Sequence, residues 1–308
     1  MTAFLLTRLS STLIGILGVL FLVFLLIHLI PGDPVEVMLG ESALQADKEA
    51  LRHSLGLDLP LHQQWWHYLG SLLRLDLGHS LFSGRPILDL IAERIPATLY
   101  LSLVSLVIAI VFALPLGLLA ATHKHQLWDM GAMGFALLGI SIPNFWLGPI
   151  LILVGSLWLG WFPVSGQEGW NAVVLPAFTL GTAMAAILAR MVRSSLLETL
   201  GEDFLRTAQA KGLSPTRILL IHALPNSLLP ILTLLGLQLG GLLGGAVITE
   251  TMFAWPGLGL LMIEAIQQRD YPVVQAAVLC ISLTYILVNL LTDVVYAWLD
   301  PRIQFKRT

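Results

Sequence analysis

The sequence is poor in charge, since aspartate, glutamate, lysine and arginine make up 11% of its 308 residues. Soluble domains carry about 25% charged residues, and 56% of this chain is hydrophobic, so a soluble fold is excluded. Its one cysteine, Cys280, lies in an apolar segment and has no partner for a disulfide within the chain. The net charge of −3 argues against a nucleic-acid partner.

The sequence also lacks the motifs of common catalytic sites. It contains no G-x-x-x-x-G-K-[ST] phosphate-binding loop, no H-E-x-x-H zinc motif and no G-x-S-x-G nucleophile elbow. Its histidines show no metal-binding pattern; His62 and His67, for example, are five residues apart and do not share a helix face. We therefore predict that the chain is not an enzyme, has no catalytic residues, holds no metal and binds no cofactor of its own.

Long apolar segments stand in place of those motifs. A membrane helix needs about 20 apolar residues, and six segments are long enough. They lie at 9–30, 97–121, 131–159, 173–192, 225–249 and 273–298. We interpret the first as an uncleaved membrane helix, because its apolar run is about 22 residues long and no small-residue cleavage site follows it. The predicted fold class is an all-α polytopic membrane protein with six transmembrane helices.

The distribution of lysine and arginine predicts the orientation of these helices. Ten of these residues lie on the side of the N-terminus and six on the other side, five of them in the long segment 31–95. Charge in long segments controls topology weakly, so the bias predicts that both termini are cytoplasmic. The predicted organisation is an N-terminal transmembrane helix at 1–30, an external insert at 31–96, a transmembrane core at 97–298 with a cytoplasmic loop at 193–224, and a cytoplasmic tail at 299–308.

The external insert has helical patterns near 44–55, 61–75 and 86–94. In the second of these, apolar residues recur at steps of three and four and form one face. They are Leu61, Trp65, Tyr68, Leu69 and Leu72. We expect this face to lie on the bilayer surface or on the transmembrane bundle; a docking surface for an external protein is the alternative.

The charged residues inside the predicted spans are Arg190 and Asp293, both near span ends. An ion-coupled transporter usually needs ionisable groups at the middle of the membrane. For Asp293 we favour a hydrogen bond between helices, or a pair with Arg190, over a proton relay. Energy for any pumping is therefore expected to come from another subunit.

The polar segment EDFLRTAQAKGL at 202–213 has the pattern of a short helix. Glu202 and Asp203 are acidic where a helix N-terminus favours negative charge, and Lys211 is basic near the C-terminus. Gly212 suits the position that follows a helix. A helix of about ten residues is marginal alone in water, so we expect it to pack on the membrane bundle or on a cytoplasmic partner.

This segment and its continuation resemble the cytoplasmic "EAA" loop of ABC-importer permeases. That loop has the pattern E-A-A, three residues, glycine, nine residues and I-x-L-P. Residues 206–208 stand at E-A-A, Gly212 at the glycine and 222–225 at I-x-L-P. Alanine, glycine, leucine and proline match, whereas Arg206 replaces the glutamate and His222 the isoleucine. The form R-T-A-x-A-K-G is similar to the peptide/nickel branch of these permeases.

Further segments of the same family resemblance run along nearly the whole chain. They are HLIPGDP at 28–34, LGLDLPL at 55–61, RIPATL at 94–99, MVRSS at 191–195, LGEDF at 200–204, ETMFAWPGLG at 250–259, RDYPVVQ at 269–275 and NLLTDVVYAWLDPRI at 289–303. Many ordered motifs make a stronger signal than one loop. The chain is identified as a member of this family, similar to the first permease of a dipeptide importer.

The resemblance implies partners and a mechanism. A second homologous permease would complete the pathway in a bacterial inner membrane, cytoplasmic ATPases would bind ATP and Mg²⁺, and a periplasmic binding protein would deliver substrate. The helix at about 202–211 would sit in a groove of an ATPase, with Phe204 and Leu205 as apolar anchors and Thr207 and Ala208 allowing close approach. The implied coupling residues are Glu202, Asp203, Phe204, Leu205, Arg206, Thr207, Ala208, Lys211 and Gly212.

Candidates for a pathway or gate are fewer. Pro143 breaks the helical pattern of the third span and Asn144 adds an amide there, so they form a gate candidate or a structural kink. Gln238 and Glu250 are further pathway candidates. Trp255 is expected at a membrane interface. The cluster of Gly240, Gly241, Gly244 and Gly245 is expected to pack closely against another helix.

The predicted function is a permease subunit of an ATP-driven importer for di- or oligopeptides. The same machinery importing nickel or a metal chelate is the alternative substrate class, because selection in this family rests largely with the binding protein. An ion-coupled secondary transporter is the alternative mechanism, and a non-transporting membrane scaffold is disfavoured by the coupling loop.

Overall fold

The computed structural model describes residues 2–29, 33–40 and 42–299. It divides into two compact units. One unit comprises Leu99–Trp255 and the segment from Leu287 onwards, and the other comprises Thr2–Thr98 and Pro256–Ile286. The long helices α5 (Ile87–Thr122) and α13 (Tyr271–Leu299) each contribute to both units.

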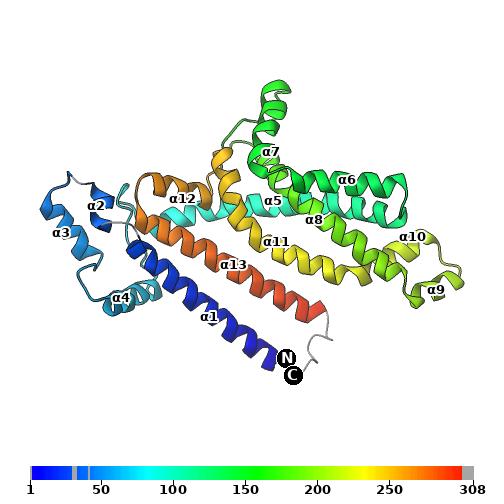
Figure 1. Ribbon diagram of the computed structural model, residues 1–308, viewed down its shortest axis with the longest axis horizontal. Helices are drawn as coiled ribbons and strands as arrows, with labels where there is room; N and C mark the ends of the chain where they lie inside the picture. Colours follow the sequence, from blue (N-terminus) through cyan, green and yellow to red (C-terminus); the bar gives the residue numbers. More distant parts are fainter. Residues whose placement is uncertain (1, 30–32, 41, 300–308) are drawn as a thin grey trace. The chain divides into compact units, whose positions relative to one another are not determined.

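The remaining described elements belong to one unit or the other, and Figure 1 labels the α-helices. The Leu99–Trp255 unit holds α6 (Leu127–Ser141), α7 (Asn144–Leu151), the π-helical η2 (Ile152–Trp158), α8 (Val174–Leu200), α9 (Asp203–Ala210), α10 (Pro215–Arg217), the π-helical η3 (Ile218–Ala223) and α11 (Leu224–Met252). The other unit holds α1 (Thr2–Leu26), η1 (Ile27–Leu29), α2 (Pro34–Leu39), α3 (Gln45–Ser54), α4 (Leu61–Leu73) and α12 (Leu258–Gln267). Within the described residues the fold is helical, which confirms the predicted class.

Within the described residues, five helical stretches are long and apolar enough to cross a membrane. They are Ser10–Leu29, Ile87–Thr122, Val174–Leu200, Pro215–Leu242 and Tyr271–Thr292. The predicted third span, 131–159, corresponds to α6 and the α7–η2 helix, which meet at a bend of 100° at the break expected from Pro143; counted as one span, this bent pair is the sixth. The residue before a proline is driven out of the helical region. Ile142, which precedes Pro143, is accordingly extended at φ −89° and ψ 114°, so α6 ends there.

In the Leu99–Trp255 unit, α8 packs against both α6 and α11 (Figure 1). Small residues also let α8 approach α5 closely. A Cβ added to Gly117 of α5 would lie 2.5 Å from Val192 of α8, and one added to Gly181 of α8 would lie 2.9 Å from the Ser105 carbonyl oxygen of α5.

The close packing predicted for the glycine cluster of α11 is not found at Gly241. A Cβ added there meets no described atom within 4 Å. Gly244 and Gly245 lie outside the residues whose surroundings the structure describes. The close contact of α11 with α13 is instead at Gly236, where an added Cβ would overlap Thr292.

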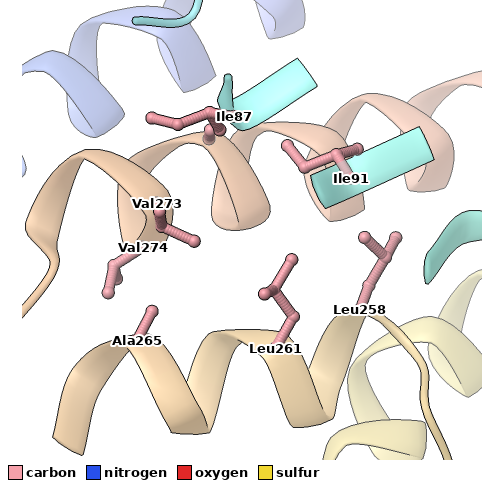
Figure 2. Packing of buried hydrophobic residues seen from close by; sticks show 8 residues of the cluster. Ile87, Ile91, Leu258, Leu261, Ala265, Val273 and Val274 are labelled. Atoms are coloured by element: carbon pink, nitrogen blue, oxygen red, sulfur yellow. The ribbon is translucent and has the colours of Figure 1, made fainter. Parts of the chain in front are cut away.

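The other unit contains an apolar cluster that joins three helices (Figure 2). It includes Ile87 and Ile91 of α5, Leu258 and Leu261 of α12, and Val273 of α13. The turn before α5 is held to the start of α13, because the hydroxyl of Ser80 donates to the Asp270 carboxylate at 2.6 Å. The helical patterns predicted for the insert are confirmed as α3, α4 and the start of α5.

The amphipathic helix α4 lies against the end of α1. Trp65 contacts Phe21 and Phe24 with ring centroids 5.6 and 5.4 Å apart, and the Tyr68 ring lies 5.8 Å from that of Phe24. His28 Nε2 and the side-chain oxygen of Gln64 are 2.9 Å apart. The apolar face of α4 is therefore used within the chain, which favours the expected contact with the bundle over docking of an external protein.

Candidate functional site

The helix predicted at 202–211 forms as α9. Glu202 occupies its N-cap position in an extended conformation, and Lys211 occupies the C-cap position. Gly212 follows with a φ of 76°, and its N–H donates to the Gln209 carbonyl oxygen at 2.9 Å. Arg206 and Asp203 are paired at 3.2 Å on the surface of the helix. The short, glycine-terminated helix expected from the sequence is confirmed.

One face of α9 is buried in the chain itself. Leu205 is 2% exposed and Ala208 is 8% exposed. They join a cluster with Leu196 of α8 and Ala223 of η3, together with Ala121 of α5 and Ile218 of η3. The interpretation of Leu205 as an anchor for a partner is therefore wrong, and so is that of Ala208 as a small residue facing one. Their side chains hold α9 to its own bundle.

The other face of α9 is open. Phe204 keeps 44% of its surface exposed, although it is a large aromatic side chain. Glu202, Asp203, Arg206, Thr207, Lys211 and Gly212 are also exposed. The successive residues Phe204 and Leu205 point in different directions because neighbours on a helix are separated by about 100°. Of the two predicted anchors, Phe204 alone is available to another protein.

Two polar contacts hold α8 just before the cluster that supports α9. Arg193 donates two hydrogen bonds to the Asp129 carboxylate, from Nε to Oδ1 at 2.6 Å and from Nη2 to Oδ2 at 2.7 Å. The hydroxyl of Ser195 donates to the Ser227 carbonyl oxygen of α11 at 2.9 Å. Sequence reasoning missed both contacts. The one available signal was the segment MVRSS at 191–195, which carries Arg193 and Ser195.

The pathway candidates are spread over the Leu99–Trp255 unit. Pro143 is exposed and Asn144 half-buried at the α6–α7 bend. Both side-chain amide atoms of Gln238 are buried, without a hydrogen-bond partner among the described residues. Glu250 is fully buried. Gln238 and Glu250 are about 18 Å apart along the axis of α11, so the four residues do not form one cluster.

Trp255 was expected to anchor the chain at a membrane interface, but its side chain is buried within the protein. It is 1% exposed and stacks on Tyr100, with ring centroids 6.2 Å apart. The chain turns back after α11, because the Trp255 N–H donates to the Glu250 carbonyl oxygen at 2.8 Å. This turn directs the indole into the protein.

Two other expectations concern charged groups. Arg190 is exposed, but the side chain of Asp293 lies outside the described residues, so their pairing stays a prediction. Across residues 2–29, 33–40 and 42–299, three or more histidine, cysteine, aspartate or glutamate side chains do not gather in a way that could hold a metal ion.

Comparisons with known proteins place this geometry in context. A model of the family described as "binding-protein-dependent transport system inner membrane component" matches residues 113–305, and the model of its N-terminal region matches residues 1–102. The glutathione transport system permease protein GsiC of Escherichia coli K12 is 45% identical over 96% of this chain and 97% of its own length. The same protein of Shigella boydii serotype 4 is 44% identical over the same shares.

Two solved structures have a similar fold. A subunit of the MetNI methionine ABC transporter in an inward-facing conformation matches with a TM-score of 0.60 and 21% identity, covering 68% of this chain and 96% of the other. A chain of an amino acid ABC transporter matches with a TM-score of 0.52 and 16% identity, covering 70% of this chain and 94% of the other.

Proposed function

This chain belongs to the family of binding-protein-dependent transport system inner membrane components, as an ABC-importer permease of the peptide type, and from that premise we propose the following function. The chain forms one half of the membrane pathway of an ATP-driven importer for di- or oligopeptides. A second, homologous but different permease forms the other half. A periplasmic binding protein delivers the peptide, and cytoplasmic ATPase subunits bind ATP and Mg²⁺.

The two-sided helix α9 is the observation that carries this proposal. Its inner face is fixed to the bundle by Leu205 and Ala208, while its outer face presents Phe204. A helix that is fixed on one side and exposes an aromatic residue on the other is suited to pass force from a bound subunit into the bundle. In the proposed orientation both termini and α9 are cytoplasmic, and the insert with α3 and α4 is periplasmic, in agreement with the positive-inside bias.

The proposed substrate is a small peptide of the glutathione type. The support is the 45% identity to a glutathione permease over nearly the full length of both chains. Import of nickel or a metal chelate by the same machinery is the other substrate class in this proposal. No observation on the chain favours it.

An ion-coupled mechanism is the rival mechanism, and the buried carboxylic acid Glu250 is the observation that favours it. Glu250 also takes part in an interaction within the chain, however, as a structural carboxyl group does. We therefore assign the energy source to the ATPase subunits.

Uptake in proteoliposomes tests the function. The importer is reconstituted from this permease, the second permease, the ATPases and the binding protein, and entry of radiolabelled glutathione and of a dipeptide is measured. We expect uptake that requires ATP inside the liposomes and the binding protein outside. Uptake by this chain alone, driven by a proton gradient, would favour the ion-coupled mechanism. Uptake of nickel but of neither peptide would replace the substrate class.

A further inference from the structure

Helix α8 connects the support of α9 to the rest of its unit. Leu196, which lies in the cluster under α9, is fully buried. Arg193 is one helical turn earlier and is bonded to α6, while the neighbouring Ser195 is bonded to α11. Both polar contacts therefore lie within one turn of α8 from the cluster under α9.

The Asp129 carboxylate also holds the turn that precedes α6. Its Oδ2 atom also accepts a hydrogen bond from the His125 N–H at 2.9 Å. His125 has a φ of 63°, in the left-handed region that residues other than glycine rarely occupy. The carboxylate thus holds the tight turn that joins α5 to α6 as well as the first turn of α6, and Arg193 holds the carboxylate.

The contact between α6 and α8 is apolar at one end and an ion pair at the other. Near the far end of α6, a Cβ added to Gly139 would lie 3.1 Å from that of Ala186, so the helices meet there through small apolar groups. Apolar contacts of this kind do not fix the relative orientation of two helices, because they are not directional. A guanidinium group paired with a carboxylate through two parallel bonds has a fixed geometry. The pair is also largely shielded, since the Asp129 side chain is 6% exposed and that of Arg193 is 25% exposed.

We propose that Asp129 and Arg193 are positioning residues that transmit the movement of α9 through α8 to α6. α6 is the first half of the broken span, so its displacement acts on the bend at Ile142 and Pro143. This inference rests on the proposed function, because it assumes that an ATPase moves α9. Stability alone is a weak explanation of the pair, because buried ion pairs often give little net stability compared with apolar packing.

The test uses the complete importer in proteoliposomes. Arg193→Lys keeps the positive charge but loses the two-pronged geometry, and Asp129→Asn keeps the shape but loses the charge. Arg190→Lys is the matched control, because Arg190 is an exposed arginine one turn earlier on the same helix. For each variant we measure ATP hydrolysis, peptide uptake, co-purification of the ATPases and the melting temperature of the complex.

We expect both variants, Arg193→Lys and Asp129→Asn, to assemble and to hydrolyse ATP, because the residues of α9 and of the cluster under it are unchanged. Asp129→Asn should lower the melting temperature more than Arg193→Lys, since it leaves the shielded Arg193 guanidinium without its carboxylate. Peptide uptake per ATP hydrolysed should fall about tenfold if the free energy of one hydrogen bond to a charged group is lost from the coupling between α8 and α6. The control should keep the wild-type ratio.

Two results overturn the inference and leave the proposed function standing. In one, both variants keep the wild-type uptake per ATP. In the other, the melting temperature, the assembly and all activities of both variants fall together, which would assign the pair a structural role. A wild-type importer whose uptake does not depend on ATP would overturn the proposed function itself and this inference with it.

Discussion

Shortening Phe204 and shortening Leu205, the two adjacent apolar residues of α9, should affect different properties of the protein. Leu205 is 2% exposed and sits in a closed cluster, whereas Phe204 is 44% exposed. We expect Leu205→Ala to weaken the fold around α9 while Phe204→Ala weakens binding of the ATPase. The pair forms a matched test, because both changes remove apolar atoms from the same eight-residue helix.

The magnitudes follow from burial. Replacing a buried leucine by alanine costs about 2–5 kcal/mol through lost burial and the cavity left behind. Complete burial of a phenylalanine side chain gives about 1.5–3 kcal/mol, and 44% of Phe204 is still open to a partner. Covering that remainder contributes about 0.7–1.3 kcal/mol, so its loss should weaken ATPase binding about 3- to 9-fold.

Two measurements separate the effects. Thermal unfolding of the purified permease pair without ATPase reports the stability, and titration with the ATPase reports the affinity. Leu205→Ala should lower the melting temperature, and Phe204→Ala should leave it unchanged but reduce the affinity. Phe204→Asp should reduce the affinity further, since it would bury an unpaired charge. A melting temperature lowered by Phe204→Ala as much as by Leu205→Ala, with unchanged affinity, would refute the division of α9 into an inner and an outer face.

Three further changes test other parts of the structure. Gly117→Ala should destabilise the chain by about 1–3 kcal/mol through overpacking, because the added Cβ would lie 2.5 Å from Val192. Gly241→Ala is the control and should be neutral in the same unfolding assay, because there is open space around it. Equal effects of the two changes would contradict the packing described for α5 and α8. Tyr68→Phe should leave the melting temperature unchanged or raise it. The Tyr68 hydroxyl is buried, which raises its pKa to about 12, and it has no hydrogen-bond partner in the described part of the chain, so its removal breaks no bond. A clear loss of stability would reveal a bond to that hydroxyl. In a chain with Cys280 replaced by alanine, a cysteine at Gln45 should react with an impermeant thiol reagent added outside and one at Gln209 should not, and the reverse would overturn the orientation.

Local sequence predicted the helical class, the spans and α9. The hydrophobic runs predicted the spans, and the charges at the ends of α9 together with Gly212 predicted that helix. Local sequence could not assign the faces of α9. Phe204 and Leu205 are both apolar and adjacent, so eight residues offer two possible inner faces, and contact with Leu196 decides between them. The exposure expected for Trp255 failed for a related reason, because its ring is buried against Tyr100, which lies far from it in the sequence.

Long-range polar contacts were equally hidden. Asp129 and Arg193 are 64 residues apart, and neither has a spacing or a neighbour that indicates the other. Pro143 did predict a break in the third span. The angle of 100° depends on how α6 and α7 pack, which a single proline does not determine.

Because Leu205 and Ala208 attach α9 to its own bundle, they also affect how tightly another protein can bind α9. A free helix of eight residues would be largely unfolded in water, and a partner would have to order it during binding. Ordering a segment on binding lowers the affinity gained per unit of interface. Because the chain's own bundle holds α9 in helical form, the ATPase of the proposed importer would meet a preorganised surface, and little of the binding free energy would be lost to folding α9.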